Sequence, residues 1–126
     1  MLAIHCTLGH GGAWRGVGAA LEAVATITAI DLPSHGKSAA WDGVTNLHTL
    51  CTRAASGFLT ARMDLVGHSF GATVALRLAV EHPHLVRSLT LIEPVFFAAA
   101  LADFPEVAAE DIRTSRAYCV ALAQGD

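Results

Sequence analysis

The sequence predicts an α/β protein of three layers, in which a mainly parallel sheet of about four strands lies between helices. Two observations lead to this fold class. Four short apolar segments typical of buried strands are separated by longer segments with helical periodicity. A further helical stretch follows the last of these strands. Alternation of this kind is typical of parallel strands joined by right-handed helical crossovers.

The predicted strands are short and apolar, and polar or loop-forming residues follow them. The second strand alternates Thr with Ala and Ile, a pattern common in strands, and it ends at Asp31. The fourth strand ends at the pair Glu93 and Pro94. The four strands are expected at Leu2–Cys6, Ala25–Ile30, Met63–Val66 and Val86–Ile92.

The first two helices are predicted from apolar residues that recur on one helical face. A glycine-rich loop, Thr7–Ala13, leads into the first helix. Its apolar face is expected to consist of Trp14, Val17, Leu21 and Val24. The second helix follows the segment Asp42–Thr45, and its stripe is expected to consist of Val44, Leu47, Leu50, Ala54 and Phe58.

The last two helices are bounded by prolines. The third is expected over Ala72–Glu81 and ends before Pro83, because proline cannot continue a helix. The fourth begins where Asp103 can act as a cap, with Pro105 in the first turn, and runs to about Gln124.

Composition excludes several classes of function. The net charge of −3 and the lack of a Lys/Arg cluster argue against nucleic acid as a partner. No apolar run approaches the roughly 18–20 residues that span a bilayer, so we expect no membrane insertion. The first 12 residues lack the pattern of a signal peptide, and the three cysteines Cys6, Cys51 and Cys119 are interpreted as reduced thiols. These features predict a cytoplasmic protein.

The chain is unusually apolar for its length of 126 residues. Hydrophobic residues make up 53% and charged residues 15%, against about 25% charged residues in typical domains. Alanine accounts for much of the excess. The composition nevertheless suggests that part of the surface is covered by something else.

The segment Gly67-His68-Ser69-Phe70-Gly71 is the most informative motif in the chain. It is a G-x-S-x-G sequence between a predicted strand and a predicted helix, which is the context of a nucleophile elbow. A serine on such a turn has a strained backbone and an exposed hydroxyl. The two glycines are expected where a Cβ would clash, and the helix that follows directs free N–H groups at any developing negative charge.

Three other loops are expected at the same edge of the sheet as Ser69. They follow the first, second and fourth strands, at Thr7, at Asp31 and at the corner of Glu93 and Pro94. In open parallel sheets, ligands bind beyond the carboxyl ends of the strands. The sequence therefore predicts one crevice lined by four loops.

With these motifs in order, the chain resembles the central part of an esterase-like α/β-hydrolase with a lid. His5-Cys6-Thr7 is similar to the family's His-Gly-x oxyanion loop, and the segment from Asp31 to Ser38 resembles its D-x-x-G-x-G-x-S loop. The elbow Gly67–Gly71 and the segment Leu91–Pro94 match the next two motifs of the family in chain order. The resemblance implies a hydrolase core over residues 1–97 and the start of a helical lid over 98–126. It also implies the strand order Ala25–Ile30, Leu2–Cys6, Met63–Val66, Val86–Ile92.

The resemblance also implies the roles of individual residues. Ser69 is the expected nucleophile, and the backbone N–H groups of Thr7 and Phe70 are the expected oxyanion hole. His68, Val95 and Phe96 are candidates to line the substrate pocket, with lid packing as the alternative role for the last two. Glu93 is a candidate for the catalytic acid, although we favour its simpler interpretation as a loop residue that caps the turn at Pro94.

Two departures from the family pattern affect the expected activity. Cys6 and Ser34 stand where the family commonly has glycine, and a side chain at Cys6 can shift the nearby donor. The strands that carry the family's catalytic acid and histidine have no counterpart in this sequence. None of the seven histidines is expected to reach Ser69 as a base, and no residue set has metal-ligand spacing.

The leading hypothesis is a serine hydrolase of ester-like acyl substrates whose base and acid come from outside these 126 residues. It needs no cofactor, and the chain alone should be nearly inactive. The alternative is a degenerate, non-catalytic module that binds a ligand or a partner. Thioester hydrolysis, C–C bond hydrolysis and perhydrolysis on the same scaffold also stay open. Both edges of a four-stranded sheet would be unpaired, so we expect self-association or a complementing segment.

Overall fold

The computed structural model describes residues 1–96, 99 and 103–124 of the chain. It divides into two compact units, Met1–Val95 and Phe96–Asp126. The predicted boundary between residues 97 and 98 lies outside the described residues, two positions beyond this division. In the described part, no helix is both long enough and apolar enough to cross a bilayer.

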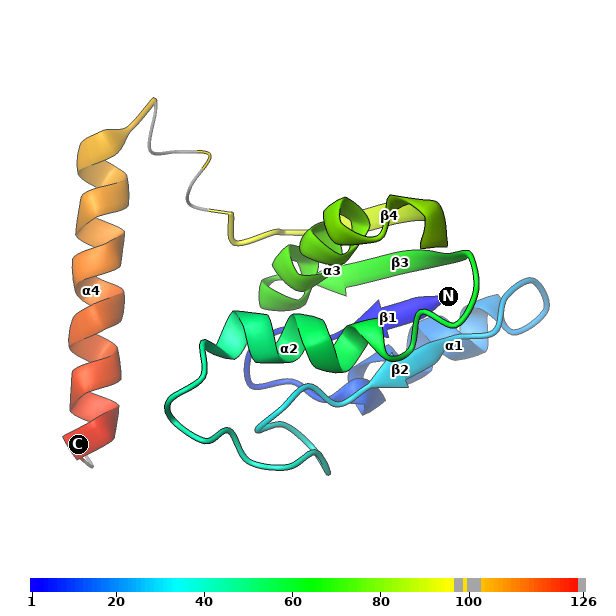
Figure 1. Ribbon diagram of the computed structural model, residues 1–126, viewed down its shortest axis with the longest axis horizontal. Helices are drawn as coiled ribbons and strands as arrows, with labels where there is room; N and C mark the ends of the chain where they lie inside the picture. The colour runs from blue at the N-terminus through cyan, green and yellow to red at the C-terminus, as the bar shows by residue number, and fades with distance from the viewer. Residues whose placement is uncertain (97–98, 100–102, 125–126) are drawn as a thin grey trace. The chain divides into compact units, whose positions relative to one another are not determined.

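The first unit is built on a parallel sheet of four strands (Figure 1). The strands are β1 (Leu2–Ile4), β2 (Thr28–Ile30), β3 (Met63–His68) and β4 (Val86–Ile92). Their order across the sheet is β2-β1-β3-β4, and each neighbouring pair is parallel. The fold class and strand order expected from the sequence are confirmed.

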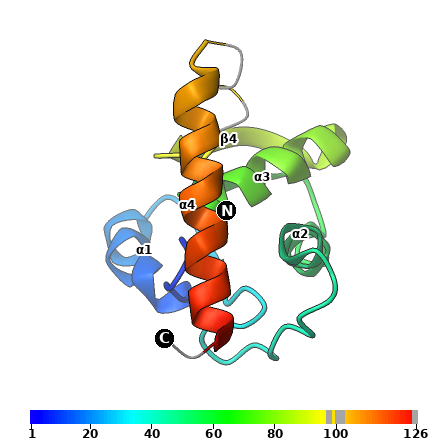
Figure 2. The ribbon, with the colours of Figure 1, turned by 90° about the vertical axis from the view of Figure 1, so that its left-hand side faces the viewer.

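Helices cover both faces of this sheet. The 3-10 helix η1 (Gly11–Trp14) continues into α1 (Arg15–Leu21), while α2 (Leu47–Ser56) and α3 (Phe70–Glu81) come later in the chain. Seen along the sheet, α1 lies on the opposite side from α2 and α3 (Figure 2). A short 3-10 helix, η2 (Pro83–Leu85), connects α3 to β4. The second unit consists mainly of α4 (Pro105–Gln124).

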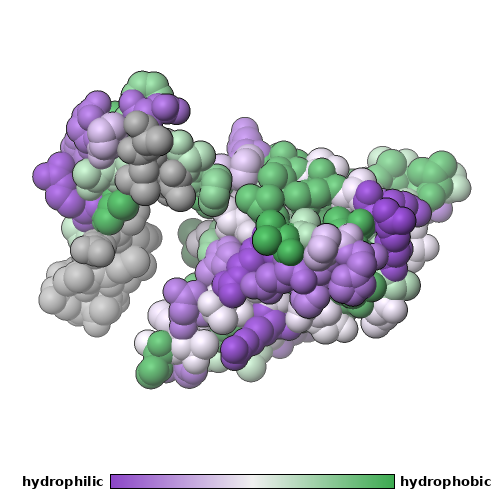
Figure 3. Space-filling view, turned by 45° about the horizontal axis from the view of Figure 1, so that its top comes forward, coloured by the Kyte–Doolittle hydropathy of each residue, from purple (hydrophilic) through white to green (hydrophobic). Residues whose placement is uncertain are grey.

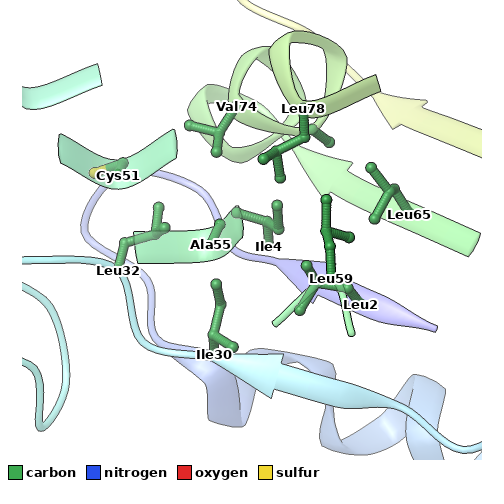
Figure 4. Packing of buried hydrophobic residues seen from close by; sticks show 11 residues of the cluster. Leu2, Ile4, Ile30, Leu32, Cys51, Ala55, Leu59, Leu65, Val74 and Leu78 are labelled. Carbon is green, nitrogen blue, oxygen red and sulfur yellow. The ribbon is translucent and has the colours of Figure 1, made fainter. Parts of the chain in front are cut away.

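The main hydrophobic core lies between the sheet and the pair α2 and α3. Side chains from β1, β2 and β3 meet side chains from the two helices there (Figure 4). Its buried members are Leu2, Ile4, Ile30, Leu32, Cys51, Ala55, Leu59, Leu65, Val74, Ala75 and Leu78. A smaller cluster on the α1 side is formed by Ala3, Trp14 and Val66.

Three apolar residues predicted on buried helical faces lie outside the helices and are exposed. Val24 follows the end of α1, Val44 precedes α2, and Phe58 follows it; their exposed fractions are 80%, 89% and 46%. The Asp42 carboxylate accepts the backbone N–H groups of Val44 and Thr45, which holds a turn where the periodicity predicted helix. The helix then begins after Asn46, whose side chain accepts the N–H of Thr49.

Candidate active site

Ser69 occupies the tight turn between β3 and α3. Its backbone has φ of 53° and ψ of −117°, a combination that residues other than glycine rarely adopt. The Ser69 N–H donates to the carbonyl of Ile92 at 2.9 Å, which ties the turn to the end of β4. The Ser69 hydroxyl makes no capping hydrogen bond to α3, and the side chain is partly exposed. This is the conformation expected of an elbow.

The two glycines of the motif are required by different neighbours. A Cβ on Gly67 would lie 2.6 Å from the Cα of Ala72 and would also meet the carbonyl oxygen of Gly71. A Cβ on Gly71 would instead meet the backbone at the end of β1, 2.8 Å from the carbonyl carbon of Ile4. The first glycine therefore permits the turn, and the second permits contact between α3 and β1.

This contact brings the loop after β1 close to the elbow. Thr7 lies in that loop, exposed, two residues beyond His5, whose carbonyl oxygen also faces Gly71. Phe70 is the first residue of α3, so its N–H is among those at the helix start that lack an intrahelical acceptor. Thr7 and Phe70 thus flank the contact between β1 and α3.

His5 holds the start of the Thr7 loop through both ring nitrogens. Its Nδ1 lies 2.7 Å from the Cys6 carbonyl, and its Nε2 accepts the N–H of Leu32 at 3.0 Å. This arrangement requires a neutral ring that donates from Nδ1. Burial lowers the pKa of His5, and the neighbouring His35 adds to the lowering.

His35 contacts the same loop from the segment that follows β2. Its Nε2 accepts the N–H of Leu8 at 3.3 Å, and its ring lies 5.0 Å from that of His5. Leu8 is held at φ of 62°, so the loop is strained where the second histidine contacts it. The rings of both histidines therefore hold backbone groups of the two loops through hydrogen bonds.

Asp31 links two of the loops at the carboxyl edge. Its carboxylate accepts the N–H of Gly11 at 2.6 Å and that of Lys37 at 2.9 Å. These hydrogen bonds lower the pKa of Asp31, and the bond from the Lys37 N–H has the largest effect. Ser34 has φ of 65°, a backbone conformation that glycine adopts more readily, and its hydroxyl accepts the Trp41 N–H.

His68 and Glu93 lie beside Ser69 at the ends of adjacent strands. His68 Nε2 is 3.9 Å from Glu93 Oε2; the Glu93 side chain is largely exposed, whereas that of His68 is half-buried. Glu93 has φ of 46°, another left-handed backbone at this edge. The structure therefore brings together two residues that the sequence suggested for separate roles.

A cavity of about 160 Å³ lies at this edge, on the α1 side of the sheet. Its walls are His5, Cys6, Ala13, Trp14, Val17, His68 and Ile92. Of the predicted pocket residues, His68 is a wall residue, Val95 is exposed and is not a wall residue, and Phe96 belongs to the second unit. A larger depression beside β2 contains none of the predicted site residues.

The sequence did not suggest Cys6, Trp14 or Ile92 as walls of a pocket. The available signal was position, because Cys6 and Ile92 stand at the ends of predicted strands and Trp14 directly follows the glycine-rich loop. Within the described residues, no group of three or more His, Cys, Asp or Glu side chains is arranged to hold a metal ion.

Comparisons with known proteins agree with this geometry. The family model described as "Alpha/beta hydrolase family" matches residues 1–123. A pimeloyl-[acyl-carrier protein] methyl ester esterase of Nitrosomonas europaea is 31% identical over 107 residues, which cover 83% of this chain and 41% of the relative. A dihydrolipoyllysine-residue acetyltransferase component of an acetoin cleaving system from Cupriavidus necator is 38% identical over 84 residues, covering 60% of this chain and 21% of the relative.

A solved structure gives the same result. The thioesterase domain from the curacin biosynthetic pathway superposes with a TM-score of 0.68 at 31% identity, over 74% of this chain and 35% of that domain. The chain therefore spans less than half the length of each of these proteins.

Proposed function

Because the chain belongs to the alpha/beta hydrolase family, we propose that it is the nucleophile-bearing part of a serine hydrolase that attacks ester-like acyl carbons through Ser69. The observation that carries the proposal is the backbone of Ser69, which has φ of 53° at the junction of β3 and α3. Strain at such a position persists only where the surrounding structure enforces it, and it is common at catalytic residues.

The proposed reaction begins with attack by the Ser69 oxygen on the carbonyl carbon of the substrate. The hydroxyl proton passes to a base, and the carbonyl oxygen becomes an oxyanion that accepts the N–H groups of Thr7 and Phe70. Each such donor contributes about 3–4 kcal/mol of transition-state stabilisation. Collapse of the tetrahedral intermediate expels the alcohol and leaves an acyl-enzyme, which water then hydrolyses.

The base and the acid are proposed to come from sequence outside this chain. The imidazoles of His5 and His35 contact backbone groups, and that of His48 contacts the Thr73 hydroxyl, so none of these three is directed at Ser69 by its hydrogen bonds. Glu93 stays a candidate acid, supported by its strained backbone and its place beside His68. Val95 and Phe96 stay candidates to contact the substrate, although neither is a wall of the described cavity. The 126-residue chain alone should therefore be nearly inactive.

The proposed substrate is a small molecule with an acyl group bound to oxygen or sulfur. The names of the three relatives specify a methyl ester, a thioester and an acetyl group, and all three concern acyl carbons. C–C bond hydrolysis and perhydrolysis use the same scaffold and stay open. We propose a cytoplasmic location, which the free thiols of Cys6 and Cys51 support.

The test supplies the missing base from solution. The chain is incubated with a fluorophosphonate probe, with and without imidazole in the buffer, and the labelled residue is identified by peptide mapping. We expect slow labelling at Ser69 that imidazole accelerates, no labelling of Ser69→Ala, and unchanged labelling of the control Ser56→Ala. A folded chain that imidazole does not make reactive would refute the hydrolase proposal and favour the non-catalytic module.

A further inference from the structure

Three wall residues of the cavity of about 160 Å³ are sequence neighbours or hydrogen-bond partners of residues in the proposed site. The wall residue His68 directly precedes Ser69, and the wall residue Ile92 accepts the Ser69 N–H through its carbonyl. A third wall residue, Cys6, directly precedes Thr7. The cavity therefore lies next to the residues proposed to hold the acyl carbon, on the α1 side of the sheet.

Size and lining restrict what the cavity can hold. An apolar cavity of about 150 Å³ admits a molecule of the size of benzene. The walls contain Ala, Val, Ile and Trp side chains, two imidazoles and one thiol, but no Lys, Arg, Asp or Glu. An ionised group would therefore find no Lys, Arg, Asp or Glu partner of opposite charge among the walls.

From this position, size and chemistry, we propose that the cavity binds a short, neutral, apolar arm of the substrate, with at most about six carbon atoms. The inference rests on the proposed function and narrows its substrate class to short-chain or small-ring acyl or alkoxy groups. A longer acyl chain would extend beyond the cavity, and an arm that ends in a carboxylate would find no Lys or Arg among its walls.

Cys6 provides a readout that does not depend on catalysis. Its thiol is partly exposed and lines the cavity, whereas Cys51 is fully buried and burial raises its pKa to about 11. Only the thiolate form of a cysteine is alkylated. In a Cys119→Ser background, alkylation by iodoacetamide should therefore report on Cys6, with mass spectrometry to confirm the site.

The experiment measures how strongly small alcohols slow the alkylation of Cys6. With 1-hexanol or benzyl alcohol at ten times its dissociation constant, the rate should fall about tenfold, as mass action requires. Hexanoate at neutral pH should protect much less than 1-hexanol. Absence of protection by either alcohol, or equal protection by hexanoate, would overturn the proposal.

Two matched variants separate the cavity from general effects on the fold. Val17→Phe fills the cavity and should abolish protection by 1-hexanol, whereas Val24→Phe makes the same change at an exposed site away from the cavity and should preserve it. Circular dichroism checks that both variants are folded. If Val17→Phe misfolds, Ala13→Leu fills the same cavity from η1 and makes the same test.

Ser69→Ala distinguishes failure of this inference from failure of the proposed function. Protection of Cys6 should persist in Ser69→Ala, because the cavity does not depend on the hydroxyl. If Cys6 is protected but imidazole never activates Ser69, the binding inference holds and the hydrolase proposal fails. If Ser69 is activated but Cys6 is not protected, the binding inference fails alone.

Discussion

The imidazole Nε2 of His48 lies 3.1 Å from the hydroxyl of Thr73, which in turn donates to the carbonyl of Phe70 at 2.7 Å. The His48 ring also meets the Phe70 ring edge-on, with centroids 5.5 Å apart. A residue of α2 therefore supports the first residue of α3, whose N–H is a proposed oxyanion donor.

Replacement of His48 should weaken this support in a way that depends on the new side chain. His48→Leu should lower the free energy of unfolding by about 1 kcal/mol, because the Thr73 hydroxyl loses its donor. His48→Gln places an amide N–H near the same position and should recover most of the loss. Urea unfolding measures the stability, and amide hydrogen exchange at Phe70 should be faster in His48→Leu alone.

The same histidine predicts a dependence of stability on pH. Burial lowers the pKa of His48 below its ordinary value of 6.5, and Arg77 adds to the lowering, while Glu81 opposes it. The unfolded chain then binds more protons than the folded chain at mildly acidic pH. The contribution of neutral His48 to the free energy of unfolding should be present above pH 6.5. It should decline as the pH falls through the pKa of His48 in the folded chain. His48→Gln should reduce this decline.

Gly67→Ala should be strongly destabilising because its Cβ would meet backbone atoms, which cannot rotate away. Overpacking of this kind costs about 1–3 kcal/mol. Gly16→Ala is the matched control: nothing lies within 4 Å of its Cβ in α1, so alanine should stabilise that helix by about 0.5–1 kcal/mol. Thermal unfolding of both variants gives the comparison, and equal effects would show that the elbow is not crowded.

Asp64 should make folding sensitive to acid. Its carboxylate is paired with the guanidinium of Arg87 and accepts the Ser88 hydroxyl at 2.7 Å, and these partners hold the pKa of Asp64 well below 3.8. Stability from this pair is therefore present above about pH 4 and is lost as the pH falls toward the folded pKa. Asp64→Asn should be less stable than the unchanged chain at pH 7, and the difference should shrink near pH 3. Arg87→Met should reproduce this pattern, and a difference in stability that does not shrink between pH 7 and pH 3 would contradict the assignment.

Within the residues that the structure describes, β2 and β4 are the unpaired edges of the sheet and should promote association. Unpaired strands template pairing with another chain, and apolar side chains also remain at the surface of the first unit (Figure 3). We expect light scattering to detect dimers or larger species unless a complementing segment is added. Thr90→Lys places a charge on β4 and should reduce association more than Thr60→Lys, which lies in a loop. A stable monodisperse monomer would rule out this prediction.

The sequence was sufficient to predict the elbow because local chemistry determines it. The apolar segment before Gly67, the glycine at each end of the motif and the apolar helix after it all require the same turn. The helix nevertheless begins at Phe70, two residues earlier than its apolar periodicity suggested, because Ser69 itself occupies the cap position. The parallel strand order followed from the family resemblance rather than from residue patterns alone.

Other features depend on contacts that periodicity does not encode. Val44 fits the stripe of α2, but the Asp42 carboxylate binds nearby backbone N–H groups in a turn and excludes helix there. The wall formed by Cys6, Trp14 and Ile92 combines residues that lie far apart in the sequence. A single sequence gives no signal for such a combination until the fold has placed its strands.

The contact between Gly71 and the end of β1 has a consequence for how the chain assembles. β1 pairs with β3, which lies far along the sequence, and the start of α3 rests on the last carbonyls of β1. The strained conformation of Ser69 therefore depends on a contact between two distant segments of the chain. Folding must close this long loop before the Ser69 hydroxyl takes its position at the turn.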